Sequence, residues 1–167
     1  MEVDILFQVG SKIVYPMHGA GVIESVEEKE IFGKKEQYFI IKLKIDNMKV
    51  MIPESKIATS NIRPVVDQGT LKDVLDVMEN GETDSELNSK QRYTTNMEKM
   101  KTGSLQDGVE VVRDLTRLNQ EKALNTNEKQ MLDNARKIVI SELGLIKGIS
   151  DQEAGKFIED KTVLTGS

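Results

Sequence analysis

The hydrophobic pattern of this sequence changes its period near residue 66, and this change constrains the fold more than any other feature. Across residues 39–52, apolar side chains largely alternate with polar ones, which is the period of a half-buried strand. Across residues 71–78 they recur three and four positions apart, which is the period of an amphipathic helix. Strands that precede helices in this way indicate an α+β fold rather than a βαβ sheet.

The first 66 residues predict five short strands separated by turn residues. Pro16 and Gly19, the run Phe32-Gly33-Lys34-Lys35 and the pair Asp46-Asn47 supply the turns. The expected strands are residues 11–15, 20–31, 39–45, 48–53 and 62–66. Five short strands in so few residues indicate a small antiparallel β-barrel or strongly bent sheet of the SH3/Tudor type. A module of this size is marginally stable alone, so we expect it to lean on the segment that follows.

The remainder predicts an all-helical module of four to five helices. The expected helices are residues 70–80, 89–102, 105–118, 126–143 and a short last one at 151–160. Asp67 or Thr70 is expected to cap the first helix, and Gly81 to end it. Asn125 and Glu128 have the spacing of a capping box before the fourth helix. We therefore predict two domains, residues 7–66 and residues 67–164.

Two finer expectations concern the helical module. Arg113 and Arg117 are i, i+4 neighbours, and we expect them on the face of their helix opposite its apolar stripe. From Thr162 onward, the chain is expected to be frayed.

The composition excludes several classes of site. The chain has no cysteine, which excludes disulfides, thiolate nucleophiles and cysteine-based zinc sites. Its single histidine, His18, lies in a Pro/Gly turn, where we expect a structural role. The acidic runs at residues 27–28 and 82–86 lie in polar surroundings without an apolar pocket to raise a carboxyl pKa. We therefore expect no enzyme, no metal site, no cofactor and no small-molecule substrate.

The charge balance argues against a protein that mainly binds nucleic acid non-specifically. The formal net charge is −5 at pH 7. Residues 67–87 carry one lysine against seven acidic residues, whereas residues 88–147 carry 11 basic and eight acidic residues. Such a charge run is usually a solvated face. The sequence has neither a basic, apolar secretory leader nor an apolar run of membrane-spanning length, so we expect a cytoplasmic protein without a membrane partner.

The segment from Lys49 to Pro53 has the pattern of an edge strand. Val50 and Ile52 are expected to face the core, while Lys49 and Met51 point outward. An edge strand offers unpaired backbone groups to a partner's sheet, and an exposed methionine is adaptable contact material. The alternative is that Met51 merely covers a second small apolar cluster. This segment is therefore a candidate protein-binding edge.

Several motifs carry a resemblance to a known family. They are the opening run Val9-Gly10-x-Lys12-Ile13-Val14-Tyr15-Pro16-x-His18-Gly19-Ala20-Gly21, and in the helical part Arg92-Tyr93-x-x-Asn96-Met97-Glu98-Lys99, Glu110-Val111-Val112-Arg113-Asp114-Leu115 and Glu128-Lys129-x-Met131-Leu132-x-x-Ala135-Arg136. The chain resembles the CarD/CdnL family of bacterial RNA polymerase-binding transcription regulators. Its opening module also resembles the polymerase-interacting domain of transcription-repair coupling factors. Residues 1–6 precede the point where the family usually begins, as a native extension or an expression remnant.

The resemblance implies that the β module pairs with the β subunit of RNA polymerase. The implied polymerase-binding residues are Lys29, Lys49, Val50, Met51, Ile52 and Pro53. The helical module would then face promoter DNA near the upstream edge of the transcription bubble. The implied DNA-binding residues are Ser89, Lys90, Arg92, Lys129 and Arg136, because basic side chains register a protein on a duplex. Each of these cations is alternatively a solvated surface charge.

The sequence departs from the family at one informative position. Many members carry a tryptophan at the start of the second helix that wedges into the minor groove. This chain has no tryptophan, and the matching residue is Ser89.

Taken as a whole, the resemblance implies a non-enzymatic regulator that modulates the stability of open promoter complexes. The alternatives are a polymerase- or protein-binding adaptor without productive DNA contact and, less expected, a hydrolase or small-molecule-binding protein that uses the carboxylates.

Overall fold

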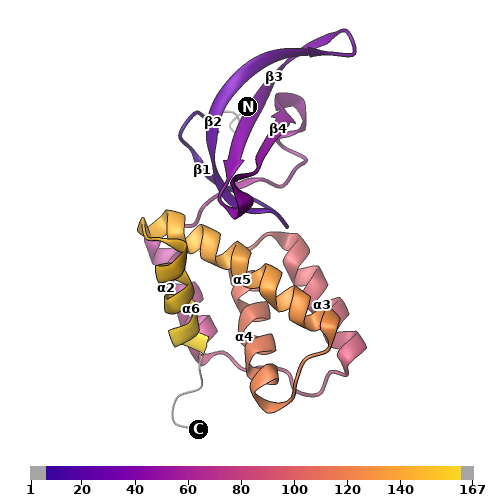
Figure 1. Ribbon diagram of the computed structural model, residues 1–167, viewed down its shortest axis with the longest axis vertical. Coiled ribbons are helices and arrows are strands. Elements are labelled where there is room, and N and C mark those ends of the chain that lie inside the picture. The colour runs from indigo at the N-terminus through magenta and orange to yellow at the C-terminus, as the bar shows by residue number, and fades with distance from the viewer. Residues whose placement is uncertain (1–6, 163–167) are drawn as a thin grey trace.

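A computed structural model describes residues 7–162 of the chain, as a five-stranded antiparallel sheet followed by five helices. Figure 1 shows the sheet and the helices as two adjacent bodies. The strands are β1 (Lys12–Tyr15), β2 (Gly19–Ile31), β3 (Lys34–Leu43), β4 (Lys49–Pro53) and β5 (Arg63–Pro64). The helices are α2 (Gln68–Asn80), α3 (Ser89–Thr102), α4 (Leu105–Glu121), α5 (Thr126–Lys147) and α6 (Asp151–Thr162). The predicted α+β fold class is confirmed.

The sheet has the strand order β4-β3-β2-β1-β5, so β4 and β5 are its two edges. Strands β1 to β4 pair in succession as antiparallel neighbours, β5 pairs antiparallel with β1, and the β2–β3 register shifts between Ile23 and Ser25. Such a bulge bends a strand, and Figure 1 shows β2 bending along its length. One face of the sheet covers a buried cluster. Its members are Phe7, Ile13, Ile23, Phe39, Ile41, Leu43, Ile52, Ile57 and Ile62.

Two details of the predicted strands differ. The turn between β2 and β3 is only Phe32-Gly33, and β3 already begins at Lys34. Ile45 lies outside β3, in a short 3₁₀ turn, η1 (Ile45–Asn47). The reason is that Asp46 and Asn47 adopt positive φ angles of 58° and 52°, which end the extended alternation.

The helix starts follow the capping residues. Asp67, not Thr70, caps α2, because its side chain accepts a hydrogen bond from the Thr70 N–H at 2.7 Å. Asn125 caps α5 in the same way, through the Glu128 N–H at 2.8 Å. The reciprocal half of the predicted capping box is absent there, because the Glu128 carboxylate points to Arg92. The expectation of fraying from Thr162 is wrong for that residue, which is 2% exposed within α6; residues 163–167 lie outside the described residues.

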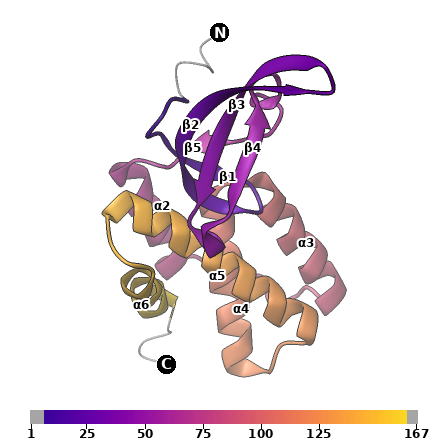
Figure 2. The same ribbon diagram turned by 45° about the horizontal axis from the view of Figure 1, so that its top comes forward.

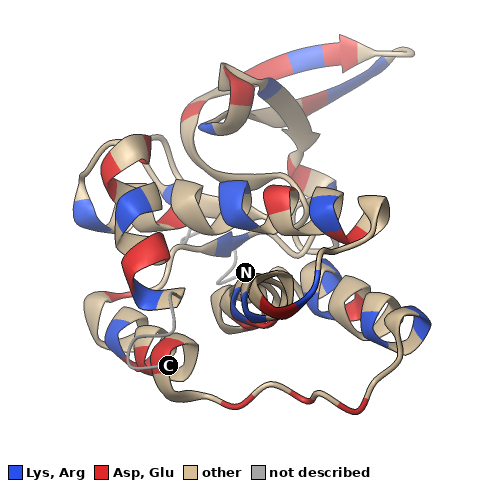
Figure 3. Cartoon of the chain, turned by 60° about the horizontal axis from the view of Figure 1, so that its bottom comes forward, with Lys and Arg blue, Asp and Glu red and all other residues tan. Residues whose placement is uncertain are grey.

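Arg113 and Arg117, which were expected opposite the apolar stripe of their helix, pack against the end of α2. Arg113 is 5% exposed and donates to the Val77 and Glu82 carbonyls, both at 3.0 Å. Arg117 donates to the Gly81 carbonyl at 2.6 Å. Desolvation, followed by repulsion from Arg113, lowers the pKa of Arg117. The two arginines thus hold α4 against the end of α2 and the acidic segment that follows it. Figure 3 colours the acidic positions of this segment red along the loop between α2 and α3.

The helices pack around their own hydrophobic core, and α5 also packs against β2 of the sheet. α5 lies against the sheet, as Figure 2 shows. Ser141 Oγ accepts a hydrogen bond from the Ala20 N–H at 2.9 Å. Glu142, 2% exposed, accepts two hydrogen bonds from the Arg63 guanidinium, at 2.6 and 2.8 Å, and one from the Val66 N–H at 3.0 Å. The small sheet therefore gains buried polar contacts from α5 that it could not make alone.

The two-domain division at residues 66 and 67 stays a prediction, and its last residues, 163–164, lie outside the described part of the chain, as do residues 1–6. Among residues 7–162, no helix combines the length and the apolar content that crossing a bilayer requires.

Candidate protein and nucleic-acid interfaces

The outer side of β4 is a free strand edge. Within residues 7–162, β4 pairs only with β3, and the backbone hydrogen bonds outside helices and ladders include none from residues 49–53. The Leu43 N–H donates to the Met48 carbonyl at 2.8 Å. Because bonded and non-bonded pairs alternate in an antiparallel ladder, the backbone groups of Lys49 and Met51 point away from β3. A partner strand could bind them there.

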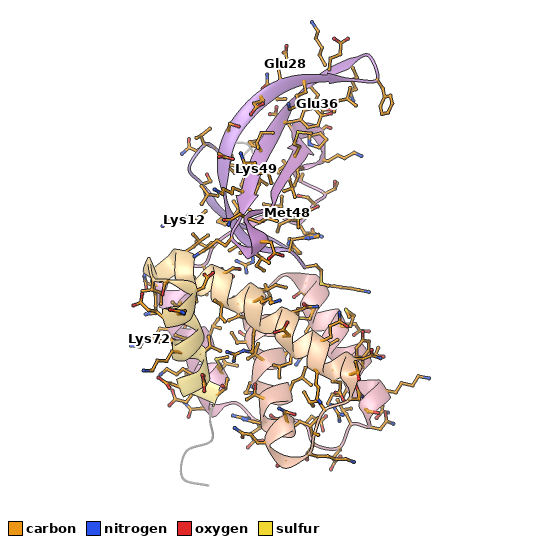
Figure 4. The ribbon with its side chains drawn as sticks, viewed as in Figure 1. Lys12, Glu28, Glu36, Met48, Lys49 and Lys72 are labelled. Carbon is orange, nitrogen blue, oxygen red and sulfur yellow. The ribbon has the colours of Figure 1, made fainter. Side chains whose placement is uncertain are left out.

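The side chains of β4 alternate as the sequence predicts. Ile52 is 6% exposed and half-buried Val50 packs on the same core. The backbone groups of these two residues point to β3, so neither residue presents its backbone at the free edge. Met51 is 49% exposed, and the Lys49 side chain is 60% exposed. Figure 4 labels Lys49 beside the strands of the sheet and Met48 at the end of the sheet that is nearest the helices. Met51 lies opposite Ile40, which is buried but belongs to neither core cluster, so the alternative in which Met51 covers a second small cluster stays a prediction beside the binding role.

Four of the six predicted polymerase-binding side chains, those of Lys29, Lys49, Met51 and Pro53, share one face of the sheet, whereas Val50 and Ile52 face the core. Met51 lies opposite Ile40, and Ile40 lies opposite Ser25. Lys29 is four residues beyond Ser25 on β2 and therefore points to the same face as Met51. Pro53 is two residues beyond Met51 and shares this face as well.

Two lysines of this face are already paired with carboxylates, whereas exposed Lys42, opposite Lys49, has no ion pair within residues 7–162. Lys49 lies 3.3 Å from Glu24, and Lys29 lies 3.5 Å from Glu27. A hydrogen bond from Ser25, supported by the charges of Lys29 and Lys49, lowers the pKa of Glu27. The face is therefore a charge-balanced, partly apolar surface rather than a basic patch.

The structure places four of the five predicted DNA-binding residues on the surface of α3 and α5. Ser89 and Lys90 are exposed in the first turn of α3. Lys129 is exposed and Arg136 half-buried on α5; they are seven residues apart and so share one face, about 10 Å apart along the helix axis. Within residues 7–162, Lys90, Lys129 and Arg136 have no ion-pair partner.

Arg92 has a different role from the predicted DNA contact. Its Nε and Nη2 atoms donate to the two oxygens of Glu128, at 2.6 and 2.9 Å. Glu128 is 2% exposed, and the Arg92 side chain is 19% exposed. The hydrogen bond to Glu128 raises the pKa of Arg92, despite opposing desolvation. The guanidinium therefore ties α3 to α5, and its fork is not free to bind phosphate.

A surface hollow of about 410 Å³ lies beside this ion pair. It joins the N-terminal ends of α3 and α5 to the loop after α4. Its lining residues are Ser89, Arg92, Leu118, Lys122, Ala123, Leu124, Asn125 and Glu128. The hollow adds exposed Lys122 to the candidate cations, a residue that sequence reasoning missed. The only sequence signals for Lys122 are that it follows a predicted helix and that no acidic residue lies four positions before or after it.

The residues considered for catalysis do not converge. The His18 ring stacks on Tyr15 with centroids 4.6 Å apart, and the His18 N–H donates to the Tyr15 carbonyl at 2.8 Å. Glu27 and Glu28 are successive strand residues and point to opposite faces. Asp84 accepts a hydrogen bond from the Glu86 N–H at 3.0 Å in an exposed segment. Over residues 7–162, no three His, Asp or Glu side chains are grouped to hold a metal ion.

A groove of about 460 Å³ lies between the sheet and the helices. Five methionines line it, and Asp46 is its single carboxylate. The methionines are Met17, Met48, Met97, Met100 and Met131, of which Met100 and Met131 are buried. The paired carboxylates that acid–base chemistry would require are therefore not found here.

Comparisons with known proteins agree with the sequence resemblance. A model of the CarD-like/TRCF RID domain matches residues 7–66, and a model of the CarD C-terminal domain matches residues 73–159. A Bacillus subtilis (strain 168) protein named "Putative transcription factor YdeB" is 55% identical over 152 residues, which are 91% of this chain and 99% of that protein.

A solved structure is also similar over part of the chain. The solution structure of the 72-residue N-terminal domain of Myxococcus xanthus CarD is 29% identical, covers 35% of this chain and 77% of that domain, and has a TM-score of 0.31. The two family models together span most of residues 7–159. The chain therefore belongs to the CarD family of transcription factors, and this membership supports a role in transcription regulation.

Proposed function

We propose that this chain is a non-enzymatic regulator that binds the β subunit of RNA polymerase and modulates the stability of open promoter complexes. The β4 edge docks on the polymerase by strand pairing, and the helical module meets promoter DNA at the upstream edge of the bubble. A ligand shifts the closed–open equilibrium only if it prefers one of the two states. The helical module would therefore make better contacts with melted DNA than with duplex.

The observation that carries the proposal is the free edge of β4. Lys49 and Met51 present both outward backbone groups and exposed side chains, and nothing within residues 7–162 pairs with them. Strand addition supplies affinity through the main chain and specificity through alternate side chains. The charge-balanced face supports recognition by shape and register more than by net charge.

A substitution on this edge tests the docking site. Met51→Glu and Lys49→Glu should each abolish binding of the full chain to core RNA polymerase in a pull-down, because each adds a carboxylate to the edge strand on the sheet face that already carries Glu24 and Glu27 of β2. Met48→Glu is the matched control, since Met48 is also 49% exposed but precedes β4. Circular dichroism should show all three variants folded. Unchanged polymerase binding by both edge variants would refute this interface.

The proposed DNA contacts are Ser89, Lys90, Lys129 and Arg136. Arg92 is left out of this set because its guanidinium is bound to the Glu128 carboxylate. Ser89→Trp should lengthen the lifetime of open complexes, because an apolar wedge at the first residue of α3 would stabilise an unstacked base step. Gln152→Trp, at an exposed position in the first turn of α6, is the control. Equal lifetimes for wild type and Ser89→Trp would mean that α3 is not at the bubble edge.

The second candidate is a polymerase-binding adaptor without productive DNA contact. It is favoured by the Arg92–Glu128 ion pair, which withdraws one predicted phosphate contact, and by serine at the position of the family's tryptophan. A footprint of promoter-bound polymerase with and without the protein separates the two candidates. Additional protection upstream of the bubble supports the first, and an unchanged footprint with retained polymerase binding supports the second.

A further inference from the structure

The far end of the β2–β3 hairpin is a two-stranded ribbon that extends beyond the rest of the sheet. Residues 28–31 of β2 pair with residues 34–37 of β3, whereas β4 reaches only residues 38–42. All of these ribbon residues except half-buried Lys29 and Glu36 are exposed. Figure 1 shows the β2–β3 turn at the end of the molecule away from the helices. The ribbon therefore contributes little to either core.

Phe32 at the tip of this ribbon contributes nothing to the folded chain. Its side chain is fully exposed, with a relative accessibility of 103%. Its φ angle is 53°, and that of Gly33 is 77°, as a two-residue type I′ turn requires. At the first of these positions asparagine or glycine is preferred, and a bulky residue is an outlier. Phe32 thus occupies a position that is unfavourable in two ways, because its apolar ring is exposed to water and its backbone has a φ angle that bulky residues rarely adopt.

We propose that Phe32 is an aromatic anchor that inserts into an apolar pocket of the same protein partner that pairs with β4. This inference rests on the proposed function and extends its docking surface. Ile31, 37% exposed, points to the same face as Lys29 and Met51, because the three belong to alternate rows of the sheet. Ser25 of β2 lies in the same row of the sheet as Met51, and Phe32 is seven residues beyond Ser25. The distance along the strand from this row to Phe32 is therefore roughly 24 Å. A protein surface of ordinary interface size spans this length.

The chemistry of the tip identifies the kind of partner. Residues 28–37 carry three basic and three acidic side chains, and Glu30 lies opposite Lys35 and Lys29 opposite Glu36. The tip therefore has no charge excess to attract a polyanion such as DNA. A rigid aromatic side chain with two rotatable bonds, presented on a hairpin, suits a preformed apolar pocket in a protein.

Phe32→Asn tests this inference because the proposal and a purely conformational role predict opposite results. Asparagine suits the left-handed turn position, so the variant should unfold at a Tm about 2 °C or more above wild type. If Phe32 is an anchor, the same variant should bind core RNA polymerase at least tenfold more weakly, as expected for loss of an interface hot spot. Phe32→Tyr should retain most of the binding. The pair Glu30→Ala and Lys35→Ala controls for general disturbance of the ribbon.

The affinities of the full chains for core polymerase, measured by biolayer interferometry, decide the outcome. Higher Tm with weaker binding for Phe32→Asn, and near wild-type binding for Phe32→Tyr and the alanine controls, supports the anchor. Wild-type affinity in Phe32→Asn overturns it; if Met51→Glu still abolishes binding, the proposed function stands without it. A wild-type chain that does not bind polymerase overturns the proposed function and this partner together.

Discussion

The Arg92–Glu128 ion pair makes a prediction that decides whether Arg92 is structural or a DNA contact. Removing Arg92 leaves a carboxylate that is 2% exposed without its cation. Breaking a fully buried pair in this way typically costs about 3–5 kcal/mol. Two features reduce the loss: the Arg92 side chain is 19% exposed, and Glu128 keeps a hydrogen bond from Asn125 Nδ2 at 3.2 Å in the first turn of α5.

We therefore expect Arg92→Ala to lower the free energy of unfolding by about 2–3 kcal/mol. With a urea m-value of about 2 kcal/mol/M, the midpoint of unfolding should fall by about 1 M. The assay is urea unfolding followed by circular dichroism at 222 nm, on Arg92→Ala, Glu128→Gln and the double variant. The double-mutant cycle should give a coupling energy of about 2 kcal/mol that persists at 0.5 M NaCl, because the pair is largely buried.

Lys90→Ala is the matched control, since Lys90 is exposed two residues earlier on α3 and has no ion pair within residues 7–162. Its stability should lie within about 0.5 kcal/mol of wild type. A loss below about 0.5 kcal/mol for Arg92→Ala, with a coupling energy near zero, would refute this reasoning. The guanidinium would then be free, and Arg92 would return to the set of candidate phosphate contacts.

Two further predictions concern the junction of the modules and the response to acid. Glu142→Gln should lower the free energy of unfolding by about 2–3 kcal/mol in urea, because the amide cannot match the charge of Arg63; a loss under about 0.5 kcal/mol would contradict the buried pair. The hydrogen bond from the Thr70 backbone N–H lowers the pKa of Asp67 in the folded chain. The ionised Asp67 side chain therefore stabilises the fold above the ordinary aspartate pKa of about 3.9. This stabilisation is lost as the pH falls through the lower pKa of the folded chain. Asp67→Asn keeps a capping oxygen without a charge, so the Tm difference between wild type and variant should shrink below about pH 4; a constant difference from pH 7 to pH 2.5 would contradict it.

Much of the fold could be predicted because it depends on local pattern. The alternation that turns Ile52 inward and Met51 outward is a property of any strand with one buried face. Asp67 and Asn125 cap their helices because a short side chain reaches the N–H three residues on. The same local logic gave the order of strands before helices and the segment that forms the candidate β4 edge.

The candidate DNA surface was less predictable, because sequence spacing does not distinguish a solvated cation from a buried one. Lys90 and Arg92 look alike at the start of a helix, yet only Arg92 meets a carboxylate, 36 residues away in the chain. Arg113 and Arg117 were expected only to lie opposite the apolar stripe of α4, and the structure shows that both donate to carbonyls at the end of α2.

The sequence by itself determined which residues form strands and helices, which side of each is apolar, and where each helix begins, because these follow from periods and caps within a few residues. Only the tertiary structure decided which charges are withdrawn into ion pairs, as in Arg63 with Glu142 across 79 residues. It also decided that Phe32 stands fully outside the core. The physical reason is that the burial and ion pairing of a side chain depend on which helix and sheet faces are in contact. Those contacts join residues far apart in the sequence and are fixed only by the packing of the whole chain.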